Sequence, residues 1–90
     1  MDDLSKPLVR ANLEYHELHD GGVVCDTSAD KIYTLNLTAA YVWNCLDGSN
    51  SVRLIASKLH QQANVPAKRA LEDVREAIAS FRSEGLLDSE

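Results

Sequence analysis

The segment Lys31-Ile32-Tyr33-Thr34-Leu35-Asn36 decides how this chain folds, because the hydrophobic period changes at its end. Up to Leu35 the residues are rich in β-branched and aromatic side chains, which favour a strand. Asn36 is a good helix N-cap, since its side chain can accept from the free N–H groups of a first turn. From Leu37 onward the apolar residues recur at helical spacing. The sequence therefore predicts sheet before this segment and helix after it.

Two more strand-like runs precede this segment. The alternating run over residues 12–18 predicts a first strand, and Val23-Val24-Cys25-Asp26 predicts a second. We expect Asp20-Gly21-Gly22 to form the turn between them, because glycine adopts positive φ without steric cost. A polar connection, Thr27-Ser28-Ala29-Asp30, then leads to the third strand, Lys31 to Leu35. These runs predict a three-stranded antiparallel meander.

Three helices are expected after the meander. The first runs from Leu37 to Leu46, and Ser51 caps the second. Pro66 suits the first turn of the third helix, and Gly85 suits the left-handed position at its end. Leu54 falls outside the apolar stripe of its helix, so we expect it to be exposed. The expected buried stripes are Ala39, Val42, Trp43 and Leu46, then Val52, Ile55, Ala56, Leu59 and Ala63, then Ala67, Ala70, Leu71, Val74, Ala77, Ile78 and Phe81.

The order of these elements predicts an α+β fold, namely a winged helix-turn-helix-like domain with a three-stranded antiparallel β-meander followed by three helices. Ninety residues make one small domain. Residues 1–11 show no clear period, so we expect a flexible or loosely docked N-terminal arm. The domain then covers residues 12–87, and residues 88–90 form a C-terminal tail.

Composition and charge narrow the classes of function. The formal net charge is −5, which argues against tight nucleic-acid binding, because that normally depends on Lys and Arg displacing counterions from phosphates. No apolar run approaches the ~20 residues that span a bilayer, so no membrane partner is expected. The start, Met1-Asp2-Asp3-Leu4, is acidic where a signal peptide would be basic. The sequence therefore predicts a cytoplasmic protein.

Residues with catalytic or metal-binding chemistry are few. Cys25 and Cys45 are too few for a disulfide scaffold and lack the spacing of a metal or redox pair. His16 and His19 are three apart at the end of a strand, so they should point to opposite faces, and His60 stands alone. There is no nucleophile–base pair and no glycine-rich phosphate loop. We therefore expect no enzyme activity, no metal and no cofactor.

Several short motifs are weak singly and distinctive as a set. They are Tyr33-Thr34-Leu35-Asn36, then Trp43 with Leu46-Asp47-Gly48, and the closing Gly85-Leu86-Leu87. Together with Gly21-Gly22-Val23-Val24-Cys25-Asp26, they resemble the PqqD family over about residues 13–87. The family includes the peptide chaperone of pyrroloquinoline quinone (PQQ) biosynthesis and leader-binding proteins of lasso-peptide clusters. The resemblance implies a winged-helix-like fold called a RiPP precursor peptide recognition element.

The resemblance also implies a function and its partners. Family members bind the leader of a ribosomally made precursor peptide and present its core to a maturation enzyme, often a radical SAM protein or a protease. The leader pairs as an added strand on the third β-strand and packs against the third helix. This agrees with the residues, because a strand at the edge of a small sheet offers free N–H and C=O groups to a peptide. Such an edge can also pair with its own copy, so a homodimer is possible.

The expected peptide-binding residues lie on these two elements. Leu35 is expected in the core, and Tyr33 either in the core or in the wall of the groove. A strand approaches a helix closely only where side chains are small, so one flank of the third helix should line the groove, with charged residues at its rim. Asp73 either serves this groove or is a surface carboxylate paired with Arg69. The full expected set is Lys31, Ile32, Tyr33, Thr34 and Leu35 on the strand, Ala70, Asp73, Ala77 and Ser80 on the helix flank, and Arg69 and Glu76 at the rim.

Two other classes of function use a similar scaffold. A winged-helix DNA-binding regulator would want a recognition helix rich in Lys and Arg, whereas the second and third helices here carry mixed charge. The chain could also be a structural subunit that docks permanently on an enzyme and binds no peptide. The sequence favours the leader-binding chaperone over both.

Overall fold

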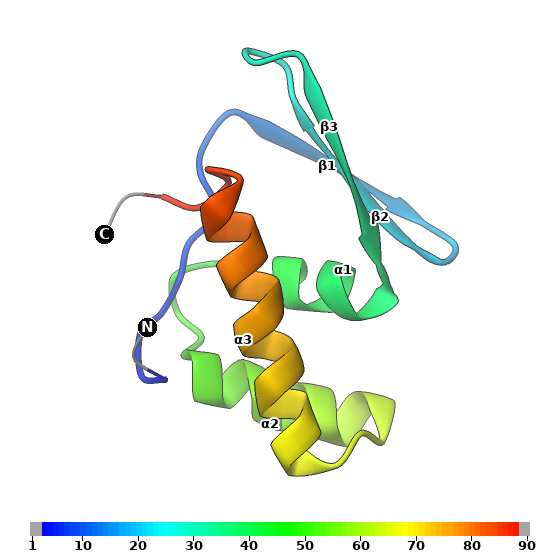
Figure 1. The fold of residues 1–90 in the computed structure, drawn as a ribbon, viewed down its shortest axis with the longest axis vertical. Coiled ribbons are helices and arrows are strands. Elements are labelled where there is room, and N and C mark those ends of the chain that lie inside the picture. Colours follow the sequence, from blue (N-terminus) through cyan, green and yellow to red (C-terminus); the bar gives the residue numbers. More distant parts are fainter. Residues whose placement is uncertain (1–2, 89–90) are drawn as a thin grey trace.

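The computed structural model describes residues 3–88, and its elements follow the expected order (Figure 1). They are, in chain order, β1 (Leu13–Leu18), β2 (Gly21–Asp26), β3 (Lys31–Asn36), α1 (Leu37–Asn44), α2 (Val52–Ala63) and α3 (Ala67–Ser83). The strands form an antiparallel sheet in the order β1-β2-β3. In Figure 1 the sheet lies at one end of the molecule and α2 at the other, with α1 between them and α3 alongside. The predicted α+β fold is confirmed.

The turn between β1 and β2 differs from the one expected. It consists of His19 and Asp20, and both glycines lie inside β2. A Cβ atom on Gly21 would lie 2.0 Å from the backbone carbonyl oxygen of Leu35 in the neighbouring strand. Gly22 pairs with Leu35 in the ladder. The glycines therefore allow neighbouring residues to approach β2 closely. The expectation that Gly21 and Gly22 form the turn was wrong.

The helix caps expected from the sequence are confirmed. The Asn36 side chain accepts a hydrogen bond of 2.8 Å from the backbone N–H of Ala39, and Ser51 caps α2 in the same way. At the end of α3, Gly85 has a φ of +73°, and the N–H of Leu86 donates to the carbonyl of Phe81 at 2.9 Å. This is a Schellman motif, which satisfies the last carbonyls of the helix.

The core lies between the inner face of the sheet and the helices. Trp43 of α1 is its centre: its ring packs edge-to-face on Phe81 of α3 with centroids 5.2 Å apart, and it stacks on Tyr15 of β1 at 6.5 Å. Such aromatic pairs stabilise beyond the area that they bury. Through these contacts α1 packs on both the sheet and α3. The buried hydrophobic residues are Val24, Leu35, Ala40, Val42, Trp43, Cys45, Leu46, Val52, Ile55, Ala56, Leu59, Ala70, Val74, Ile78, Phe81 and Leu86.

Some residues of the expected stripes lie elsewhere. Helix α1 ends at Asn44, and Leu46 is buried from the loop that follows. Ala39 is only half-buried, because it faces an open groove between β3 and α3. Ala63 and Ala67 are exposed, since they flank the surface turn between α2 and α3, where no element covers them. The exposure of the Leu54 side chain, at 42%, agrees with the prediction.

The N-terminal segment makes more contacts than a loosely docked arm. The N–H of Val52, in the first turn of α2, donates to the Ser5 carbonyl at 3.0 Å, and Val9 donates to the Leu46 carbonyl at 3.1 Å. The segment thus satisfies a free donor at a helix start, an interaction that hydrophobic periodicity does not reveal. Residues 1–2 of the expected arm and 89–90 of the expected tail lie outside the described residues. The division into arm, domain 12–87 and tail stays a prediction.

One buried ion pair ties this segment to the sheet. Asp26 at the end of β2 is only 5% exposed, and its carboxylate accepts from Arg10 at 2.6 Å and from the Ser28 hydroxyl at 2.9 Å. The hydrogen bond from Ser28, followed by that from Arg10, lowers the pKa of the Asp26 carboxyl from its ordinary value. A charge in this position is tolerated because it is paired and hydrogen-bonded.

Candidate functional site

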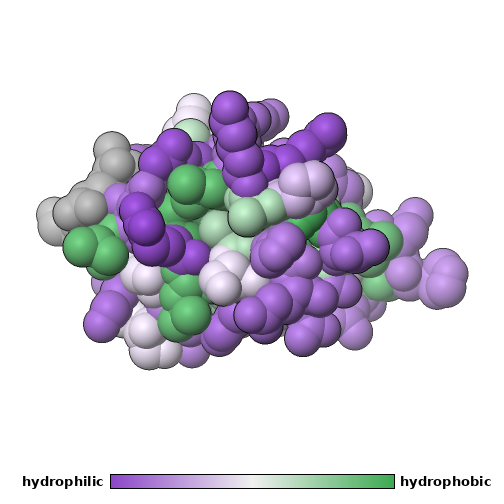
Figure 2. Space-filling view, turned by 90° about the horizontal axis from the view of Figure 1, so that it is seen from below, coloured by the Kyte–Doolittle hydropathy of each residue, from purple (hydrophilic) through white to green (hydrophobic). Residues whose placement is uncertain are grey.

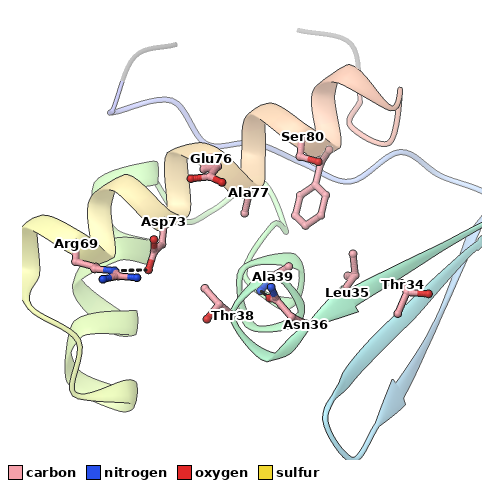
Figure 3. A pocket seen from close by; sticks show the side chains of 11 residues that line it. Thr34, Leu35, Asn36, Thr38, Ala39, Arg69, Asp73, Glu76, Ala77 and Ser80 are labelled. Atoms are coloured by element: carbon pink, nitrogen blue, oxygen red, sulfur yellow. Dashed lines mark hydrogen bonds and ion pairs between the residues drawn. The ribbon is translucent and has the colours of Figure 1, made fainter.

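The outer edge of β3 borders a groove. Within residues 3–88, β3 pairs with β2 on one side and with no strand on the other. Helix α3 runs across from this edge, and the space between them is a groove of about 410 Å³ (Figure 3). The groove is lined by Thr34, Leu35, Asn36, Thr38, Ala39, Arg69, Asp73, Glu76, Ala77, Ser80 and Phe81.

Local structure explains both walls. One wall is the end of β3 and the first turn of α1, which meet at Asn36 because its side chain stops the strand and caps the helix. The other wall is one flank of α3, where Asp73, Ala77 and Ser80 recur at the three- and four-residue spacing of a single helix face. Small side chains at Ala39 and Ala77 keep the groove open between the walls.

The groove differs from one end to the other. At the end nearer the C-terminus of α3, Phe81 and Leu35 form an apolar floor, and both side chains are buried. At the opposite end Arg69 and Asp73 lie side by side, with Nε 3.9 Å from Oδ2 (Figure 3). Glu76 lies between these two ends along the helix. The groove can thus make apolar contacts at one end and charged contacts at the other.

Seven of the residues predicted for the site come together in this groove. Asp73 is paired with Arg69 and also lines the groove, and its service to a bound peptide stays a prediction. The small residues expected on the flank and the charged residues expected at the rim lie on the same face of α3. The seven residues are Thr34, Leu35, Arg69, Asp73, Glu76, Ala77 and Ser80.

Four predicted residues lie outside the lining. Ala70 is fully buried in the core, so its side chain has no surface for a ligand, and its place in the expected flank is corrected. Lys31 and Ile32 are exposed at the far end of β3 from the groove. Tyr33 is half-buried and packs against the core. These three can meet a peptide only along the open edge of the strand.

The sequence interpretation missed four lining residues. Asn36 was considered only as a helix cap, and Phe81 only as a core residue. Thr38 and Ala39 enter because the first turn of α1 folds back beside the strand that precedes it. An available signal was the immediate junction of strand and helix at Asn36, which forces the following turn to lie near the strand end.

The described part of the chain carries little other chemistry. Residues 3–88 contain no group of three or more His, Cys, Asp or Glu side chains that could hold a metal ion. Burial raises the pKa of the Cys45 thiol, so this cysteine behaves as a small hydrophobe rather than a reactive thiolate. No helix among these residues is both long enough and apolar enough to cross a membrane.

A second, smaller hollow lies between α2 and α3. It measures about 230 Å³ and is lined by Ala56, Ala67 and Leu71 with Arg53, Ser57 and His60. Figure 2, which views the molecule from the α2 end, shows apolar side chains on this face interrupted by polar ones. It holds none of the residues predicted for the site.

The fold and the groove define a class of protein: small winged helix-turn-helix-like α+β domains with an open strand edge facing a helix. Two solved structures share this fold. The first, "Lasso peptide synthetase B1 complexed with the leader peptide", has a TM-score of 0.81 and 21% identity, covering 94% of this chain and all of that one. The second, "TbiB1 in Complex with the TbiA(beta) Leader Peptide", has a TM-score of 0.79 and 13% identity, covering 92% and 96%. A comparison with curated proteins gave no match.

The family itself follows from the sequence match. Residues 21–87 match the model of the family described as coenzyme PQQ synthesis protein D, PqqD. The chain belongs to the PqqD family, and the resemblance seen in its motifs is confirmed.

Proposed function

We propose that this chain binds the leader of a ribosomally synthesised precursor peptide as an added strand on β3. The observation that carries the proposal is the open edge of β3 facing the groove along α3. Membership of the PqqD family supports it. So do the titles of both structural neighbours, each of which names a complex with a leader peptide.

Strand addition explains how a groove without catalytic chemistry can bind a peptide. The backbone of an extended peptide hydrogen-bonds to the free N–H and C=O groups of β3, which gives affinity for many sequences. Alternate side chains of the peptide then point toward α3, where Ala77 and Ala39 leave room for them. The apolar floor at Leu35 and Phe81 offers a place to bury an apolar side chain.

The bound peptide is presented to a separate maturation enzyme, a radical SAM protein or a lasso-type protease. In this proposal the chain acts as a peptide chaperone and carries out no reaction itself. The enzyme acts in trans, and the core of the precursor extends from the groove toward it. A homodimer formed through the β3 edges would compete with the leader for the same backbone groups.

Binding should be measured with labelled leader peptides from short reading frames adjacent to the gene. We expect saturable fluorescence anisotropy with wild type, and amide shifts in the NMR spectrum confined to residues 31–36 and 69–81. Ala77→Arg fills the groove and should weaken binding at least tenfold. Ala79→Arg, two residues away on the exposed side of α3, is the matched control. Amide shifts outside both ranges would contradict the proposed site.

DNA binding is the competing function for a winged helix-turn-helix-like fold. The net charge of −5 opposes it, because phosphate contacts would lack the necessary surplus of Lys and Arg. A gel shift that weakens steeply with salt, with no affinity for any leader, would favour the regulator. A stable enzyme partner without leader affinity would favour a structural subunit.

A further inference from the structure

The two ends of the groove face different parts of a bound peptide. Strand β3 ends at Asn36, and the chain continues as helix α1. A peptide can therefore pair with the backbone of β3 only up to this point. Beyond it, toward Arg69, the wall formed by α3 offers the peptide side chains alone, because the backbone of a helix interior is already hydrogen-bonded. Sequence selectivity at the α3 wall has to come from side-chain contacts.

The charges that line the groove do not balance. Three ionisable side chains line the groove: the carboxylates of Asp73 and Glu76 and the guanidinium of Arg69, which together carry a net charge of −1. The Arg69–Asp73 pair is long, at 3.9 Å, and the side chain of Arg69 is 72% exposed. An exposed pair of this kind contributes little and is easily rearranged. Among the described residues, Glu76 takes part in no ion pair.

Partial burial of the Asp73 carboxylate strengthens its attraction for a cation. Its side chain is 32% exposed, less than half the value for Arg69. Solvent screens a charge less where the side chain is partly buried, so a cation beside Asp73 interacts more strongly than one at the open surface. Thr38 on the opposite wall adds a hydroxyl oxygen that can accept from an ammonium or guanidinium group, whereas the Asn36 oxygen already accepts from the N–H of Ala39.

We infer that Asp73 and Glu76 on the α3 wall of the groove select a peptide with a Lys or Arg side chain just beyond the segment that pairs with β3. The inference rests on the proposed function and names the class of peptide that the site prefers. The peptide would combine an extended part with an apolar side chain for the Leu35–Phe81 floor and a basic residue at one fixed spacing from it. Arg69 then turns outward, which its exposure permits.

A selection from a random peptide library displayed on mRNA tests this without knowledge of the natural leader. Immobilised wild-type protein should enrich peptides that share an apolar position and a basic position at constant spacing. With D73N/E76Q, preference for the basic position should fall at least tenfold while the apolar position persists. The control E72Q/E84Q removes two exposed carboxylates of the α3 region outside the groove and changes the net charge equally. It should keep the basic preference.

The outcomes of this selection distinguish the inferred preference for a basic residue from the proposed peptide binding on which it rests. Enriched peptides with no basic position, or with an acidic one directed at Arg69, would overturn the inference and leave peptide binding intact. A basic preference that survives D73N/E76Q, or falls equally in E72Q/E84Q, would overturn it as well, because it would then reflect the overall charge. Failure to enrich any peptide that competes at the Ala77 groove would overturn both. Circular dichroism of each variant checks that the fold is retained.

Discussion

Replacing Gly21 by alanine should damage the edge of the sheet that forms the groove. The added Cβ would lie 2.0 Å from the carbonyl oxygen of Leu35 and 3.0 Å from its carbonyl carbon. Both atoms belong to the backbone of β3, so no side-chain rotation can relieve the contact. Strands β2 and β3 have to separate at the point where β3 leads into α1.

The expected cost follows from what separation breaks. Each ladder hydrogen bond that is lost costs about 0.5–1.5 kcal/mol, and we assume the loss of about two at this end of the ladder. Partial exposure of Leu35, now 7% exposed, adds up to about 2 kcal/mol. Gly21→Ala should thus lower the free energy of unfolding by about 1–5 kcal/mol. A domain of this size has roughly 5–13 kcal/mol in total.

Urea unfolding followed by Trp43 fluorescence and far-ultraviolet circular dichroism measures this loss. Gly85→Ala is the matched control, since Gly85 also has positive φ but its Cβ would meet no atom within 4 Å. It should cost about 1–2 kcal/mol, the price of a left-handed conformation alone. If Gly21→Ala costs no more than Gly85→Ala, close contact between β2 and β3 is not the reason for the glycine.

Three further predictions concern the scaffold of the groove. Ile55→Ala should lower the free energy of unfolding by about 2–5 kcal/mol, because Ile55 is fully buried. The neighbouring Leu54→Ala should lower it by only about 0.5 kcal/mol, because Leu54 is 42% exposed. Equal losses in urea unfolding would contradict the placement of Ile55 in the core. Asn36→Ala should lower the stability by about 1 kcal/mol, because it removes the N-cap of α1. Asn36→Asp keeps a capping oxygen and should retain that stability. Equal thermal stability of the two variants would exclude a capping role. Asp26→Asn should destabilise the protein at pH 7, and its urea midpoint should approach that of wild type as pH falls. The pKa of Asp26 is lowered in the folded state, so its contribution is present above the unfolded value of about 3.9 and is lost as pH falls through the folded value; a gap that widens on acidification would refute this.

Local signals in the sequence were reliable where one residue type has one physical role. Asn36, Ser51 and Gly85 each sit where capping requires them, because a cap depends only on the few backbone groups beside it. The glycines of β2 misled, since glycine serves both turns and close contacts, and only the neighbouring strand distinguishes the two. Ala70 was expected both in the buried stripe of the third helix and on its groove flank, and packing assigned it to the core alone.

In the candidate site, too, some features follow from neighbouring residues and others only from tertiary packing. The sequence by itself determined that strand passes into helix at Asn36 and that α3 carries a small and charged flank, because periodicity and capping are properties of neighbouring residues. Only the tertiary structure decided that this flank faces the β3 edge. Helix α1 packs on both the sheet and α3, with Trp43 seated on Phe81, and this holds the two walls apart. The groove exists because of that spacing, which depends on contacts between residues far apart in the chain.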